Sequence, residues 1–191
     1  HRKAQLVHAA EGVLHVTTAA GAWVAPPHRA IWVPSNMRHR VASRRGFRLL
    51  TLYTSPRLVK LPAGECRVVA VDRLLEELLA AAARFGSAYP AHGPEARLVR
   101  VILDRLPALS VAPLFHLPSP RSKELERITS ALLASPNDKR TLDEWAREMG
   151  LGGKTCARRF LEETGLTFGQ WRRQCRLLAA VEGLAAGHSV T

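Results

Sequence analysis

Short apolar segments dominate the first third of the chain, and within them hydrophobic and polar residues roughly alternate. Four of these segments are rich in β-branched and aromatic residues, and glycine or proline residues separate them: GVLHVTT, AWVAPP, AIWVP and FRLLTLYT. Several short strands at close spacing are typical of a small β-barrel or sandwich. We therefore expect residues 1–64 to form a small barrel, and barrels of this size can hold one small ligand.

The pattern changes to a helical period after a last strand-like segment, CRVVAV, at residues 66–71. In the next segment the apolar residues share one wide face of a helix: Leu74, Leu75, Leu78, Leu79 and Ala82. A second helix repeats the period with Leu98, Val101, Ile102 and Leu106. We expect residues 65–118 to form a helical region. Its helices can pack on each other within one subunit or on a partner subunit.

A proline-rich stretch, residues 107–120, interrupts the helical pattern and marks a boundary between domains. The segment after it, RSKELERITSALLASP, has the apolar spacing of a further helix. Two short helices joined by a glycine turn are expected next. Thr141 is a good N-cap for the first of them, and Gly150 ends it as a C′ glycine would. Residues 119–191 are therefore expected to form an all-α domain that contains a helix-turn-helix.

Helical geometry determines what the second of these short helices presents to the outside. If Cys156 and Phe160 point inward, Lys154, Ala157 and Arg158 share the outward face. Lys and Arg near a helix N-terminus fit the major groove of DNA, because arginine can bind guanine through two hydrogen bonds and flanking positive charge neutralises phosphates. The alternative is a solvated basic face on an ordinary helical hairpin.

The segment LDEWAREMGLGGKTCARRFLEETGLTFGQWRRQCRLLAAVEGLAAGHSVT resembles the first helix-turn-helix and the linker helix of the AraC/XylS family of transcription regulators. Three runs match this family in order and spacing: TCARRFLEETG, TFGQWRRQCRL and LAAGHSVT. The resemblance implies that residues 154–164 form the recognition helix. It places Lys154, Ala157 and Arg158 at base-reading positions, with Gly153 and Thr155 beside them.

The same resemblance implies that a helix over residues 168–185 joins this motif to a second helix-turn-helix, which would begin where the sequence ends. We therefore expect the chain, which also lacks a starting Met, to be a fragment of a longer regulator that lacks this second motif. The sequence departs from the family pattern at Gly152 and Gly153, where the family usually has a Ser or Thr that caps the helix. The recognition helix is expected to fray more for that reason.

The first segment resembles a cupin barrel, the sensor domain of many AraC-type regulators. His1, Gln5 and Gly12 stand at the second histidine, the carboxylate and the glycine of the first cupin motif, and Pro34 and His39 match the second motif. In a cupin enzyme such side chains bind a divalent Fe, Mn, Zn or Ni ion. Gln5 is a neutral and poor ligand, which disfavours a divalent metal here, and no other cofactor is expected.

The alternative to a metal site at His1 and His39 is an effector pocket lined by these polar residues together with Gln5. Trp23 and Trp32 could line the same pocket and contact a flat ligand. Aromatic residues of a small barrel can equally belong to its core, and this second interpretation of the tryptophans stays open.

A net charge of +12 suggests a polyanionic partner, but most of the excess lies outside the helix-turn-helix. Lys and Arg exceed Asp and Glu by nine in residues 1–60, by none in residues 61–118 and by three in residues 119–191. The densest cluster consists of Arg38, Arg40, Arg44, Arg45 and Arg48. It could contact phosphates, meet an acidic effector or keep an edge strand soluble.

Several classes of function are disfavoured by what the sequence lacks. The three cysteines are scattered and have no metal-ligand spacing, which is typical of reduced thiols in a cytoplasmic protein. No apolar run is long enough to span a membrane, and no signal peptide is visible. A phosphate loop, an HExxH motif and a nucleophile elbow are all missing, so an enzyme is not expected.

The sequence thus predicts an α+β protein with a small cupin-like barrel, helices and an all-α DNA-binding domain. Its expected function is to sense a small-molecule effector and to bind double-stranded operator DNA as a transcription regulator. The family resemblance favours a homodimer formed through the helices after the barrel, with RNA polymerase as a partner if the protein is an activator. A metal-dependent cupin enzyme fused to a helical module is the alternative, and an adaptor that uses residues 73–106 is a third.

Overall fold

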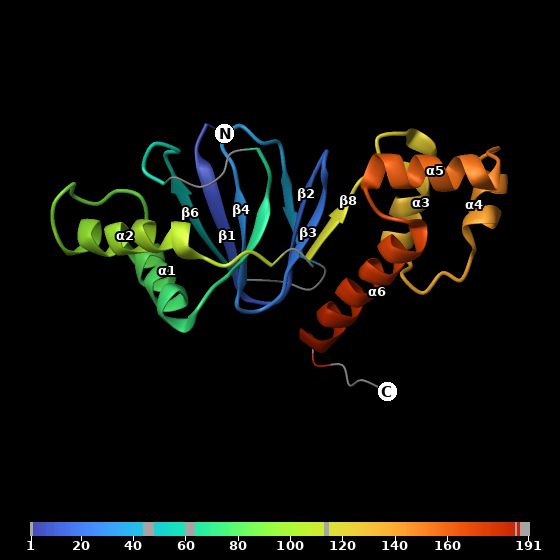
Figure 1. Ribbon diagram of the computed structural model, residues 1–191. Coiled ribbons are helices and arrows are strands. Elements are labelled where there is room, and N and C mark those ends of the chain that lie inside the picture. Colours follow the sequence, from blue (N-terminus) through green and yellow to red (C-terminus); the bar gives the residue numbers. More distant parts are fainter. Residues whose placement is uncertain (1, 44–47, 60–63, 113–114, 186, 188–191) are drawn as a thin grey trace. The chain divides into compact units, whose positions relative to one another are not determined.

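The computed structural model describes residues 2–43, 48–59, 64–112, 115–185 and 187 (Figure 1). The chain divides into two compact units: His1–Thr18 with Trp23–Phe115, and Ala19–Ala22 with His116–Thr191. The predicted α+β class is confirmed, since the described residues contain two four-stranded sheets and six α-helices.

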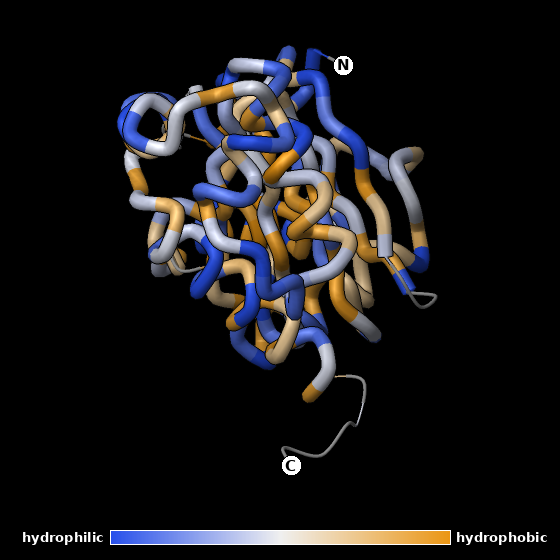
Figure 2. The backbone as a smooth tube through the Cα atoms, turned by 90° about the vertical axis from the view of Figure 1, so that its right-hand side faces the viewer, coloured by the Kyte–Doolittle hydropathy of each residue, from blue (hydrophilic) through white to orange (hydrophobic). Residues whose placement is uncertain are grey.

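The four alternating segments and CRVVAV each contain a strand, but Ala4–Glu11, Arg40–Ala42 and His116–Pro118 are strands that the sequence did not predict. Each strand of the first sheet is antiparallel to its neighbour, in the order β6 (Arg48–Thr54), β1 (Ala4–Glu11), β4 (Arg29–Val33) and β7 (Arg67–Ala70). The order in the second sheet is β5 (Arg40–Ala42), β2 (Leu14–Thr18), β3 (Gly21–Ala25) and β8 (His116–Pro118). Figure 2 shows how hydrophobic and hydrophilic residues interleave along the chain. Because side chains alternate between the faces of a strand, this pattern gives each strand two distinct faces.

The register of β1 and β4 separates two apolar cores. Val7 lies opposite Ile31, and both belong to an inner core to which β2 and β3 also contribute, so this core lies between the sheets. Leu6 lies opposite Trp32, and both belong to a second core with residues of helices α1 (Arg73–Phe85) and α2 (Pro94–Arg105). Neighbouring residues of one strand therefore lie in different cores.

Helices α1 and α2 cover the outer face of the first sheet. Asp72 caps α1, because one of its carboxylate oxygens accepts a hydrogen bond from the backbone N–H of Leu75 (2.8 Å), and the other pairs with Arg105 at the end of α2. The apolar face predicted for these helices was too wide, since Leu74 and Val101 remain about half exposed. They point away from the sheet that buries their apolar neighbours. A short 3-10 helix, η1 (Leu106–Ala108), follows α2.

The second unit is built from four helices: α3 (Lys123–Ala134), α4 (Leu142–Glu148), α5 (Gly153–Thr164) and α6 (Phe168–Ala185). Phe160 of α5 is fully buried, and its ring packs edge to face on Phe168 and Trp171 with centroid distances of 5.6 and 6.1 Å. The indole N–H of Trp171 donates to the carbonyl of Pro118 (2.8 Å). These contacts tie α5 and α6 into one core.

Among the described residues, every helix is too short or too polar to cross a membrane.

Replacing Phe160 by alanine is expected to destabilise the second unit by about 3–5 kcal/mol, because a fully buried aromatic side chain is lost and a cavity remains. Leu161→Ala is the matched control, since Leu161 is the next residue of α5 and is about half exposed. Urea unfolding followed by tryptophan fluorescence measures both free energies. Equal values for the two variants would contradict the inward orientation of Phe160.

Candidate nucleic-acid interface and sensor site

The turn between α4 and α5 is built by local hydrogen bonds. Thr141 and Glu144 form a capping box at the start of α4, in which the backbone N–H of Thr141 donates to the Glu144 carboxylate (2.6 Å). This hydrogen bond and one from the Thr141 hydroxyl lower the pKa of Glu144. Gly150 then turns the chain with a φ of 69°, a conformation that favours glycine. Helices α4 and α5 are therefore joined by a tight turn.

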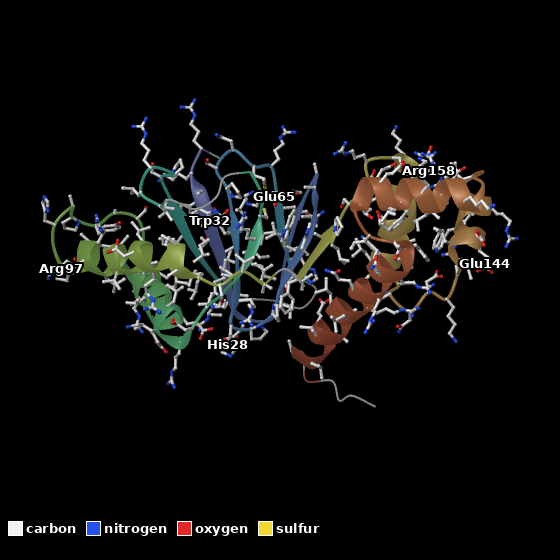
Figure 3. All side chains as sticks on the ribbon, in the orientation of Figure 1. His28, Trp32, Glu65, Arg97, Glu144 and Arg158 are labelled. Carbon is white, nitrogen blue, oxygen red and sulfur yellow. The ribbon has the colours of Figure 1, made fainter. Side chains whose placement is uncertain are left out.

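The predicted base-reading residues lie on the outer face of α5. Lys154, Thr155, Ala157 and Arg158 are exposed, whereas Cys156 between them is fully buried. Arg158 is on the surface of the helix (Figure 3), where its guanidinium donates to the Glu162 carboxylate one turn later (3.0 Å). The burial of Cys156 and Phe160 thus brings the four exposed residues onto one face.

Gly153 has a steric role at the start of α5. A Cβ atom at this position would overlap the carboxylate of Asp143 in α4, so glycine lets this carboxylate approach the first turn of α5. Gly152 supplies no side-chain cap, as the sequence indicated. A negative charge near a helix N-terminus is stabilising, because the backbone N–H groups there carry partial positive charge. Asp143 therefore compensates in part for the absent Ser or Thr cap.

Two side chains of α5 fix its orientation on α3. The Glu163 carboxylate accepts hydrogen bonds from the backbone N–H groups of Arg121 (2.7 Å) and Ser122 (2.8 Å) at the start of α3. Burial of the Glu163 carboxyl by itself would raise its pKa. The hydrogen bonds from Arg121 and from the backbone and hydroxyl of Ser122 outweigh the effect of burial, so the pKa of Glu163 is lowered. Arg159 lies 3.5 Å from the Glu124 carboxylate. Neither contact is predictable from the sequence, because an inward polar residue gives no periodic signal.

A second anchor precedes α4. The Arg140 guanidinium donates to both carboxylate oxygens of Asp138 and stacks on the ring of Trp145 at 3.4 Å from its centroid. The side-chain hydrogen bonds from Arg140 hold the pKa of Asp138 below its ordinary value. Arg172 of α6 donates to the Arg140 carbonyl (2.9 Å). This network connects the chain before α4 to α6.

In the first unit, Gln5 and His39 are brought together as the cupin resemblance implied. The Nε2 atom of His39 lies 3.0 Å from the Gln5 amide oxygen. The Gln5 amide nitrogen donates to the hydroxyls of Thr51 (2.8 Å) and Tyr53 (3.1 Å) on β6. Gln5 is 3% exposed, so these contacts satisfy a buried polar side chain. The group Gln5, His39, Thr51 and Tyr53 is called the polar cluster below.

The other predicted pocket residues lie in different places. Trp23 is buried in the inner core, whereas Trp32 belongs to the core under α1 and α2 (Figure 3). The two tryptophans therefore do not line one pocket, because the register of β4 points Trp32 to the outer face. His1 lies outside the described residues. Thr51 and Tyr53 were missed, since the sequence does not reveal which residues of β6 lie opposite Gln5.

In the part of the chain that the structure describes, no group of three or more His, Cys, Asp and Glu side chains could hold a metal ion. Within the predicted arginine cluster, Arg44 and Arg45 lie outside the described residues. Arg48 lies 3.6 Å from Glu11, and Arg38 and Arg40 are exposed.

One buried histidine lies outside the polar cluster. His8 of β1 is 1% exposed. Its Nδ1 atom lies 2.9 Å from the Arg29 carbonyl, and its Nε2 atom lies 3.6 Å from the Glu76 carboxylate of α1. The same carboxylate oxygen of Glu76 lies 2.9 Å from His28. His8 therefore links β1 to β4 and to α1.

Comparisons with known proteins agree with this architecture. The family described as AraC-like ligand binding domain matches residues 1–98. The chain is 30% identical over 190 residues to the HTH-type transcriptional regulator NimR of Escherichia coli (strain K12), which covers 100% of this chain and 69% of NimR. The HTH-type transcriptional regulator RipA of Corynebacterium glutamicum is 31% identical over 94 residues, 49% of this chain and 26% of RipA.

Among solved structures, that of the AraC-like transcriptional activator CuxR aligns with 94% of this chain and 67% of its own, at 18% identity and a TM-score of 0.44. The family match and the match to NimR define a transcription regulator with an N-terminal ligand-binding domain. The chain belongs to the AraC family of these regulators, as the sequence resemblance predicted.

Gln5→Met is expected to reduce the free energy of unfolding by ~1–3 kcal/mol, because the side chain keeps its approximate shape while the hydrogen bonds of the buried amide to His39, Thr51 and Tyr53 are lost. Tyr53→Phe removes one of these hydrogen bonds and is expected to cost less. Urea titration of both variants tests this order. A Gln5→Met variant as stable as the wild type would show that the amide contributes nothing to the fold.

Proposed function

We propose that this regulator binds double-stranded operator DNA through α5 and senses a small-molecule effector through its first unit. The observation that carries the DNA proposal is the exposed row of Lys154, Thr155, Ala157 and Arg158 beside Gly153 at the start of α5. A helix that presents such residues near its N-terminus can enter the major groove. The names of the relatives NimR and RipA, both HTH-type transcriptional regulators, support this proposal.

Each exposed residue of α5 has a chemical role in this proposal. Arg158 donates two hydrogen bonds to a guanine edge, Ala157 contacts a thymine methyl group, and Lys154 and Thr155 contact phosphates or bases. To reach guanine, Arg158 must leave the Glu162 carboxylate that it contacts in the free protein. An exposed ion pair of this kind stabilises a helix little, so the exchange costs little free energy.

The proposal extends to assembly and location. Leu74 and Val101 stay about half exposed on α1 and α2, which supports a homodimer formed through these helices. A dimer would present two copies of α5 to two half-sites of an operator. RNA polymerase is a further partner if the protein is an activator. A DNA-binding regulator of this kind acts in the cytoplasm.

Arg158→Ala is expected to weaken specific DNA binding by ~1–3 kcal/mol and to relax base preference at one position of the operator. Operator duplexes are first selected from random DNA with the wild-type protein, and fluorescence anisotropy then measures affinity for the selected and for single-base variant duplexes. Arg127→Ala is the matched control, since Arg127 is exposed on α3 and its replacement removes the same charge. Equal losses in both variants would exclude base reading by Arg158.

The sensor proposal concerns the polar cluster in the first unit. A ligand that binds the folded state alone raises the melting temperature. We expect a small organic compound to raise the melting temperature of the wild type, and we expect this ligand-induced rise to be lost in Gln5→Met. Thermal shift measurements with organic anions, aromatic compounds and divalent metals test this. A rise with a divalent metal alone, reversed by a chelator, would support a metal site at His39 and His1 instead.

A further inference from the structure

A groove is lined by residues of β6, which is an edge strand of the first sheet, and by residues of helices α1 and α2. Figure 1 shows β6 on the same side of the sheet as these helices. The volume of the groove is about 680 Å³, within the roughly 300–1,000 Å³ of small-molecule sites. All of its lining residues belong to the first unit. Leu58 lines it with a side chain that is 63% exposed. An exposed apolar side chain in a concave place is typical of a binding surface.

The walls of the groove are apolar. Strand β6 contributes Leu50 and Leu52, which are partly buried against the core under the helices. Helix α1 contributes Leu79 and Ala83, and α2 contributes Leu103. A ligand between these walls would therefore remove apolar surface of both the strand and the helices from water, which is favourable.

Aromatic side chains line the groove where α1 ends. Phe85, the last residue of α1, and Tyr89 beyond it both belong to the lining. Their rings pack edge to face with centroids 5.3 Å apart and planes at 75°. This arrangement offers ring surface to a further aromatic group, because aromatic pairs favour edge and offset contacts.

The polar groups Lys3 and Ser55 lie at the end of β6. Ala4 lies opposite Thr54, and this register places Lys3 beside Ser55. Lys3 is the one charged side chain among the lining residues that the structure describes, and it is exposed. An ammonium group has three N–H donors, so Lys3 can add an oxygen acceptor to the contacts that it already makes. The hydroxyl of Ser55 lies on the same part of the lining.

We infer that this groove binds a small organic monoacid with an aromatic or aliphatic body. The carboxylate pairs with Lys3 and accepts a hydrogen bond from Ser55, and the apolar body lies between β6 and the helices. Such a ligand ties α1 and α2 to β6. The inference concerns binding alone, so it depends neither on DNA binding by α5 nor on an effector at Gln5 and His39.

Three probes with the same body and different head groups test the inference: 4-phenylbutyrate, 4-phenylbutan-1-ol and 4-phenylbutylamine. Calorimetric titration of the 191-residue chain at pH 7.5 is expected to give tighter binding of the acid than of the alcohol, and weakest binding of the amine. Lys3→Gln is expected to weaken binding of the acid by about two- to fivefold, as for an exposed ion pair, and to leave binding of the alcohol unchanged.

Ala83→Trp fills the groove from an exposed position of α1 and is expected to abolish binding of all three probes. Glu77→Trp is the matched control, because Glu77 is exposed on the same helix and outside the lining. Binding that survives in Ala83→Trp but is lost in Gln5→Met would overturn the inference and assign the acid to the polar cluster. No binding of the acid to the wild type would overturn it too.

Sedimentation of the same variants tests whether a second copy of the chain occupies the groove instead. A dimer that Ala83→Trp dissociates, while Glu77→Trp leaves it intact and the acid has no effect, would assign the groove to the subunit interface. An unchanged state of assembly in Ala83→Trp, together with loss of acid binding, is the result expected from a small-molecule site.

Discussion

The antiparallel pairing of β1 with β4 and β6 is the constraint on which the first unit depends. Side chains alternate strictly along a strand, so one register assigns every residue of β1 to a face. Gln5 and Val7 point between the sheets, and Leu6 and His8 point to the outer face covered by the helices. A shift by one residue would bury Gln5 under the helices and move Leu6 into the polar cluster.

This register also places polar side chains on both faces of the same strands. Between the sheets, the buried amide of Gln5 contacts His39 and two hydroxyls of β6. On the outer face, His8 reaches the Glu76 carboxylate of α1. Tyr53 belongs both to the polar cluster and to the lining of the groove beside β6. Strand β6 thus contributes both to the polar cluster and to the groove beside α1 and α2.

In the second unit, the buried Phe160 has the corresponding role. Its contacts with Phe168 and Trp171 fix the rotation of α5 about its own axis. Because an α-helix turns by a constant angle for each residue, this rotation determines that Lys154, Ala157 and Arg158 are exposed. Glu163 then holds α5 against the start of α3 through two backbone N–H groups. The exposed face is therefore positioned by residues that do not belong to it.

The sequence alone did not reveal β1, β5 or β8, but it determined the class of the fold, the helices, five of the described strands, and the inward orientation of Cys156 and Phe160. These features depend on the spacing of apolar residues and on local signals such as the Thr141 cap and Gly150, which act within one element. Tertiary structure decided the rest. The separation of Trp23 from Trp32, the partners of Gln5, and the burial of His8 depend on strand register, which brings distant residues together without any local sign in the sequence.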